Sequence, residues 1–209
     1  MKRVLHIIAL VCVPLLPTGS FALTGDEALA KFQHRMLGVG TMSGTVSWLY
    51  QSGQGYVGNF KYMAPGRIYV KFTSPSGRVL VSNGKRLWVY ESSSNICGVQ
   101  DLARGGSGGI SSMVGGYLAI LTSQGPGGYT LKLKSAEKAY SDITLVLDGS
   151  FLLKKAVFNA RDGEGFSVTL SNVRTGESMI TGLFDFNVPT NAQVVMDPPG
   201  DDEEFTRQA

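Results

Sequence analysis

The feature that most constrains the fold is a two-residue alternation of apolar and polar side chains, which recurs in short runs along the chain. Between residues 41 and 50, Val46, Trp48 and Tyr50 alternate with serine and threonine. Successive side chains of a strand point to opposite faces, so this period is typical of strands with one buried face. Further runs that predict strands are 56–62, 67–72, 79–81, 87–90, 129–134, 143–147, 153–158, 166–170 and 184–188.

Turn-forming residues separate these runs. Asn83-Gly84 stands between two apolar runs and predicts a hairpin, and Asp148-Gly149 is another turn pair. The stretch 53–58 matches the glycine pattern of dinucleotide sites, but a strand follows it where such sites need a helix, so we interpret it as a hairpin. Many short strands with tight turns predict a mainly β (α+β) fold with a single curved antiparallel sheet.

Two segments depart from the two-residue period. Thr24 and Glu27 have the spacing of a capping box, and apolar residues at helical spacing follow, which predicts an amphipathic helix over 26–37. A second apolar stripe at helical spacing predicts a helix over 110–121. This stripe consists of Ile110, Met113, Val114, Tyr117, Leu118 and Leu121.

The second predicted helix is weak on its own. Gly115 and Gly116 lie within it, and each glycine costs about 1 kcal/mol relative to alanine. The helix therefore needs an apolar partner, and glycine-rich stretches at 105–109 and 125–128 flank it. Two interpretations stay open, an ordinary core helix or a movable lid.

The first residues have the three parts of a secretory signal peptide. Lys2 and Arg3 precede an apolar run, which ends before the small-x-small site at 20–22. We expect residues 1–22 to be a signal peptide and 23–209 to form one exported domain. Cys12 follows Val11 rather than the small residue of a lipoprotein signal, so we expect no lipid anchor there.

The expected mature chain offers little catalytic chemistry. His34 and Cys97 are its only histidine and cysteine, so no zinc site of ordinary ligand spacing and no internal disulfide can form. Removing Lys2 and Arg3 lowers the formal charge from +3 to about +1, with no basic stripe for nucleic acid. We expect a monomeric binding protein without cofactor or metal, and not an enzyme.

Three stretches carry a resemblance to a known family. They are GNFKYMAPGR at 58–67, VLVSNGKRLWVY at 79–90, and the run of 184–195 that begins FDFNVP. The second closely resembles the LVSDGKTLWxY signature of the LolA family of periplasmic outer-membrane lipoprotein carriers, within the LolA/LolB-like superfamily. The three matches follow the family's order across most of the expected mature chain.

The resemblance implies an incomplete β-barrel, covered by the N-terminal helix and a lid helix. It implies a non-catalytic carrier, or chaperone, which binds the acyl chains of lipid-modified proteins and moves them from the inner to the outer membrane. Its partners would be an inner-membrane ABC-type release complex and an outer-membrane acceptor. Candidates for the lipid cavity, each of which is equally a candidate core residue, are Trp48, Tyr50, Phe60, Tyr62, Val70, Phe72, Trp88 and Tyr90.

One position departs from the family. Many carriers have an arginine before the proline of the turn after the second strand, where it holds the empty cavity shut, and here that residue is Ala64. Arg67 is a candidate replacement. Other functions compatible with the resemblance are an anchored outer-membrane acceptor and a half-barrel sensor or regulator of envelope lipoproteins.

Overall fold

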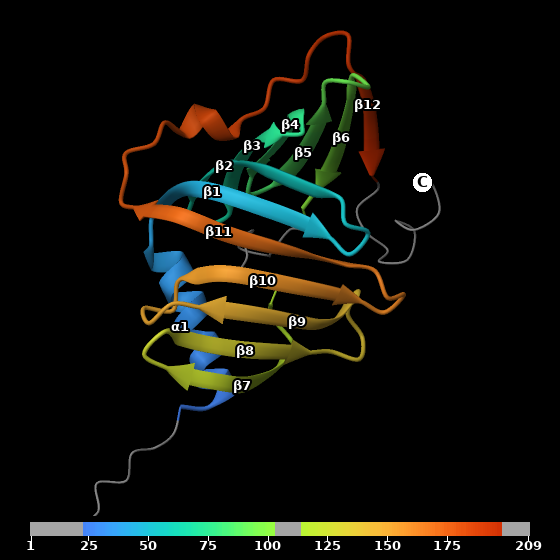
Figure 1. Cartoon of the computed structure of the whole chain (residues 1–209). Coiled ribbons are helices and arrows are strands. Elements are labelled where there is room, and N and C mark those ends of the chain that lie inside the picture. Colours follow the sequence, from blue (N-terminus) through green and yellow to red (C-terminus); the bar gives the residue numbers. More distant parts are fainter. Residues whose placement is uncertain (1–22, 103–113, 198–209) are drawn as a thin grey trace, which may run out of the picture.

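A computed structural model describes residues 23–102 and 114–197 (Figure 1). Most of these residues lie in strands, as the two-residue alternation predicts. The elements are α1 (Gly25–Gly38), β1 (Thr41–Tyr50), β2 (Gly55–Met63), β3 (Arg67–Ser74), β4 (Ser76–Asn83), β5 (Arg86–Glu91), β6 (Ile96–Asp101), β7 (Leu118–Gly125), β8 (Gly128–Lys134), β9 (Tyr140–Leu147), β10 (Leu153–Ala160), β11 (Gly165–Thr175), the 3-10 helix η1 (Thr181–Phe184) and β12 (Gln193–Asp197).

The described strands form one open, curved sheet of 12 strands. Their order is β12-β6-β5-β4-β3-β2-β1-β11-β10-β9-β8-β7, so β12 and β7 are the two edges. This confirms the predicted mainly β fold and the incomplete barrel. The sheet differs from the antiparallel prediction at one edge only, because β12 runs parallel to β6.

The predicted N-terminal helix is confirmed. The hydroxyl of Thr24 accepts a hydrogen bond from the amide of Glu27 at 3.2 Å, and the Glu27 carboxylate accepts one from the Thr24 amide at 2.9 Å. Leu29, Phe32 and Met36 are buried against the sheet. We call the face that α1 covers the inner face and the opposite one the outer face; Figure 1 shows α1 behind β7–β10, with the outer face toward the viewer.

The sheet carries a core on each face. The main core lies between α1 and the inner face, where Phe32, Leu131 and Leu145 are fully buried. A second, smaller core lies on the outer face of β3–β6, and residues 176–192, which we call the strap, cross it (Figure 1). The buried members of this outer core are Val81, Cys97, Val99 and Phe184.

Hydrogen bonds hold both ends of the strap. Thr41 Oγ1 donates to the Glu177 carbonyl at 2.7 Å, and Asn95 Nδ2 donates to the Asn191 carbonyl at 2.7 Å. The predicted strand over 184–188 is wrong, because this segment lies in the strap. Phe184 is buried against β3 and β4, and the segment adds no strand to the described sheet.

The predicted helix over 110–121 is also wrong where the structure describes it. Residues 114–116 form a turn and β7 begins at Leu118. Gly116 has a φ of +77°, which a right-handed helix excludes. The glycines at 125–128 form the tight turn between β7 and β8, whereas 105–113 lie outside the described residues.

Asp148 organises the turn between β9 and β10. Its Oδ1 accepts hydrogen bonds from the amides of Ser150 at 2.8 Å and Leu152 at 2.9 Å. Burial raises the pKa of this carboxyl, but these bonds and the positive charge of Arg35 outweigh burial and lower it below its ordinary value.

We therefore expect Asp148→Ala to lower the free energy of unfolding at pH 7 by about 1–3 kcal/mol, measured by urea denaturation. A lowered folded-state pKa stabilises fully above the unfolded value of about 3.9, and the contribution is lost as the pH falls through the folded value. The difference from wild type should therefore shrink below about pH 4. Asp162→Ala, which removes one amide hydrogen bond from Glu164, should cost less, and equal losses would contradict this role.

Candidate apolar binding site on the inner face

Strand register assigns each predicted cavity residue to a face. Phe60 pairs with Val70 across β2 and β3, and Trp48 pairs with Tyr56 across β1 and β2, so these four side chains share a face. That face belongs to the main core with α1. The predicted cavity residues on the inner face are Trp48, Tyr50, Phe60, Tyr62, Val70 and Phe72.

Trp88 and Tyr90 lie on the outer face, so the prediction that they share the inner face is wrong. Trp88 pairs with Val81 and Val99, which belong to the outer core. Tyr90 donates a hydrogen bond to Asn95 Oδ1 at 3.0 Å, and its ring lies 5.9 Å from that of Phe186 in the strap. Both aromatic side chains therefore pack under the strap and away from the inner face.

An aromatic cluster fills one end of the inner face. The Trp48 ring stacks on Phe166 with centroids 4.7 Å apart, and Phe166 stacks on Phe158 at 4.6 Å. Tyr140 meets both phenylalanines edge-on, at 5.3 and 5.8 Å. Trp48 Nε1 is buried and has no hydrogen-bond partner among the described residues. The sequence alone did not single out Phe158, Phe166 or Tyr140.

The inner-face residues of β2 and β3 are packed in this conformation. Phe60, Tyr62, Val70 and Phe72 are buried, and Tyr62 Oη donates to the Met36 carbonyl of α1 at 3.3 Å. Burial raises the pKa of Tyr62, so this phenol stays neutral at physiological pH. A ligand can reach these four side chains only if α1 or neighbouring side chains move.

The inner face of β4–β6 and β12 is less covered. Leu80 pairs with Val89, Val89 with Gly98 and Gly98 with Val195, which places them in one row on the inner face. Leu80, Leu87 and Val89 are half-buried, whereas Ile96 and Val195 are 37% and 48% exposed. We call Leu80, Leu87, Val89, Ile96 and Val195 the inner strip, and none of them was predicted as a cavity residue.

One ion pair borders the inner strip. Arg78 Nε lies 2.9 Å from Glu91 Oε2, and register places both residues on the inner face. The Arg78 guanidinium also lies 4.4 Å above the ring of Tyr56. This end of the inner face therefore combines aromatic rings with a paired charge.

The predicted lid residues have separate locations. Val114 and Tyr117 are buried in the main core, and Tyr117 Oη donates to the Tyr140 carbonyl at 3.0 Å. Leu121 packs partly against that core, whereas Leu118 is 63% exposed on the outer face of β7. Ile110 and Met113 lie outside the described residues.

Arg67 is the candidate replacement for the family arginine that holds the empty cavity shut. It donates to Met63 Sδ at 3.2 Å and forms no ion pair within residues 23–102 and 114–197. Its role as a replacement for the arginine missing at Ala64 stays a prediction.

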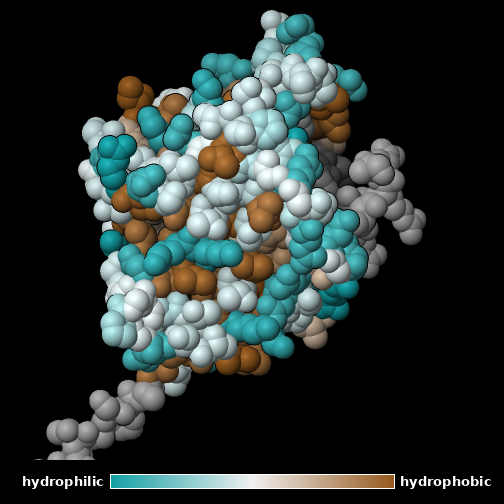
Figure 2. All heavy atoms as spheres, in the orientation of Figure 1, coloured by the Kyte–Doolittle hydropathy of each residue, from teal (hydrophilic) through white to brown (hydrophobic). Residues whose placement is uncertain are grey.

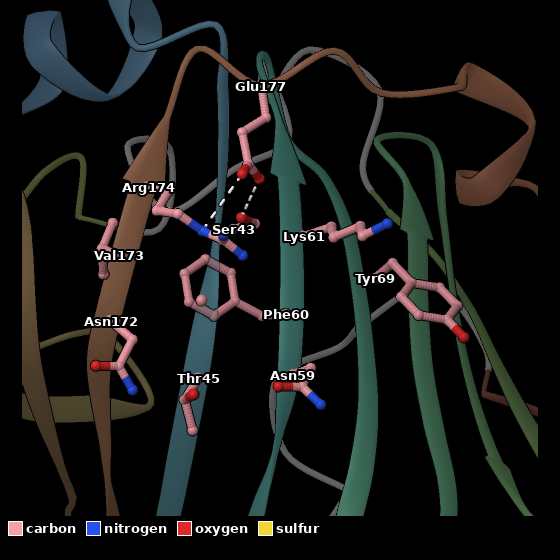
Figure 3. A pocket seen from close by; sticks show the side chains of 11 residues that line it. Ser43, Thr45, Asn59, Phe60, Lys61, Tyr69, Asn172, Val173, Arg174 and Glu177 are labelled. Carbon is pink, nitrogen blue, oxygen red and sulfur yellow. Dashed lines mark hydrogen bonds and ion pairs between the residues drawn. The ribbon is translucent and has the colours of Figure 1, made fainter.

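The outer face has a pocket of about 710 Å³ beside the start of the strap (Figure 3). Ser43 donates a short hydrogen bond to Glu177, and Arg174 Nε lies 3.3 Å from the same carboxylate. Lys61 and Tyr69 line another side of the pocket (Figure 3). Most of the residues that line it are polar or charged, and its place on the outer face separates it from the inner face.

The described residues offer little metal or nucleophile chemistry. They contain no group of three or more His, Cys, Asp or Glu side chains placed to hold a metal ion. His34 is exposed on α1, whereas Cys97 is buried on the outer face, where burial raises its thiol pKa. The sheet separates the two, so they do not form a catalytic pair. No helix of the described chain is long and apolar enough to span a membrane.

In the described residues, one open, curved sheet with one α-helix over its apolar inner face defines an incomplete β-barrel of the half-barrel class. The family model described as outer membrane lipoprotein carrier protein LolA matches residues 45–187, more than half of the chain. The protein therefore belongs to the LolA family.

Known proteins support this assignment. An outer-membrane lipoprotein carrier protein of Legionella pneumophila (strain Lens) is 24% identical over 188 residues, which cover 84% of this chain and 91% of that protein. Another, of Haemophilus ducreyi, is 26% identical over 185 residues, covering 84% and 88%. The crystal structure of an uncharacterized conserved protein from Thermus thermophilus shares the fold, with a TM-score of 0.54 at 16% identity, covering 82% of this chain and 98% of that one.

Proposed function

We propose that this LolA-family protein is a periplasmic, non-catalytic carrier that binds the acyl chains of lipoproteins on its inner face. The observation that carries the proposal is the inner strip, an apolar row that is only half covered beside a buried aromatic core. Burying a CH₂ group is worth about 0.8 kcal/mol, so shielding some 40 methylenes of a lipoprotein is worth on the order of 30 kcal/mol. The inner strip can supply such shielding, because it is an apolar surface that is partly exposed.

Loading would begin at the inner strip and extend toward the aromatic cluster. Leu80, Val89 and Val195 offer side chains that acyl chains can contact without displacing the main core. Further methylenes would replace contacts between α1 and the buried residues of β2 and β3. In this proposal residues 1–22 are removed on export, an inner-membrane release complex supplies the cargo, and an outer-membrane acceptor receives it.

Native mass spectrometry of the protein purified from an envelope extract tests this function. We expect complexes whose added mass equals that of acylated lipoproteins, and delipidated protein should take up a purified triacylated lipoprotein. A protein that remains unliganded in both experiments would contradict the carrier function. Stable binding of one signalling protein with no acylated cargo would favour the sensor alternative, and a lipid-modified N-terminus would favour the anchored acceptor.

A further inference from the structure

The outer face away from the outer core carries an excess of positive charge. Seven basic residues point outward from β1–β3 and β7–β11, and two acidic residues share that face. The basic residues are Lys61, Arg67, Lys71, Lys132, Lys134, Lys155 and Arg174, and the acidic ones are Asp142 and Glu177. Seven minus two gives this face a formal charge of +5, against +3 for the whole chain.

Both acidic residues already have a basic partner. Asp142 Oδ2 lies 3.0 Å from Lys132 Nζ, and Glu177 is paired with Arg174. The remaining four lysines are exposed and form no ion pair within the described parts of the chain; they are Lys61, Lys71, Lys134 and Lys155. Their charge is therefore available to an external anionic surface.

Exposed aliphatic side chains lie among these lysines. Leu49, Val57, Leu118 and Ile120 are between 40% and 63% exposed, and register places all four on the outer face. Figure 2 shows hydrophobic residues between hydrophilic ones across this face. Lysines around exposed aliphatic groups are typical of proteins that adsorb to anionic lipid surfaces, since the charges attract the headgroups and the aliphatic groups enter the interface.

We propose that the outer face of β1–β3 and β7–β11 docks onto the surface of an anionic phospholipid bilayer. Lys71 on β3 and Lys134 on β8 are six strand positions apart, or roughly 30 Å across the sheet. Electrostatic attraction reaches about 10 Å at 0.1 M salt, so lysines on a curved face act together without all touching the membrane. Docking through the outer face leaves the inner face free, and it requires no bound cargo.

Vesicle flotation of the cargo-free protein tests this docking. We expect association with phosphatidylcholine vesicles that contain about 30% phosphatidylglycerol, little association with pure phosphatidylcholine, and release in about 0.5 M salt. The triple variant Lys71→Glu/Lys134→Glu/Lys155→Glu should bind more weakly, on the order of fivefold or more for each lysine replaced. A matched variant with the same change in net charge is Lys31→Glu/Lys85→Glu/Lys138→Glu, whose residues are exposed elsewhere, and it should retain most of the binding.

Failure to bind anionic vesicles, equal binding to neutral vesicles, or equal losses in the two triple variants would overturn the proposal. Matching thermal unfolding of the variants and wild type shows that the fold is intact. Uptake of lipoprotein by the outer-face variant is expected to be unchanged, because the inner face is untouched. Loss of membrane docking and loss of the carrier function are therefore separate results.

Discussion

Replacing Phe184 by alanine is expected to lower the free energy of unfolding by about 3–5 kcal/mol, because it empties a fully buried ring site. Phe184 fixes the strap over β3 and β4, and the outer core has few other buried side chains to compensate. Urea denaturation measures the loss. The midpoint should shift while the slope stays the same, if the variant still unfolds in one step.

The matched control for this substitution is Phe186→Ala. Phe186 is half-buried and contacts Tyr90, so we expect a loss of about 1–2 kcal/mol. A loss below about 1 kcal/mol for Phe184→Ala, or a larger loss for Phe186→Ala, would contradict the assignment of Phe184 to the outer core.

Replacing Val89 by aspartate is expected to reduce lipoprotein occupancy more than tenfold. Val89 is half-buried in the centre of the inner strip, between Leu80 and Gly98. The new carboxylate is hydrated in the empty protein, but a bound acyl chain would exclude that water. An unpaired charge in an apolar environment costs several kcal/mol. Native mass spectrometry after incubation with triacylated lipoprotein measures the occupancy.

Two controls accompany Val89→Asp. Val89→Leu keeps the surface apolar and should load normally, and Val194→Asp places the same charge on the outer face of β12. Normal loading of Val89→Asp would show that acyl chains do not contact the inner strip. Equal loss in Val89→Asp and Val194→Asp would indicate a general effect of charge.

The sheet could be predicted from the sequence where a strand is apolar on one face and polar on the other, as in β2. In β2, buried Tyr56, Phe60 and Tyr62 alternate with exposed Lys61 and its neighbours, and this pattern identifies both the strand and its inner side. The start of α1 could also be predicted, because the capping box of Thr24 and Glu27 involves only neighbouring residues at the helix start.

The same reasoning failed for β5, which is apolar on both faces. Leu87 and Val89 belong to the inner strip, while Trp88 and Tyr90 pack under the strap. Both sets of side chains are apolar, so their alternation does not reveal which set points inward. The prediction selected the larger aromatic residues Trp88 and Tyr90, which lie on the outer face. Only the register against β4, where Val81 pairs with Trp88, determines which residues point inward.

The lid helix failed for a different reason. Apolar residues at 114, 117 and 121 have helical spacing, but Ala119 and Leu121 also alternate as a strand requires. Gly115-Gly116 lowers helix propensity, and pairing of β7 with β8 stabilises the strand instead. The pairing of β7 with β8, which local spacing does not reveal, therefore determines the structure of this segment.

Photo-crosslinking at Val195 and Val194 tests the central claim most directly. These adjacent valines of β12 are each 48% exposed, but Val195 shares the inner face with Gly98 and Val194 the outer face with Cys97. A benzophenone amino acid at either position therefore has equal access to solvent. We predict crosslinks to the acyl chains of a bound lipoprotein from position 195 and not from 194; equal crosslinking from both, or crosslinking from 194 alone, would contradict acyl binding on the inner face.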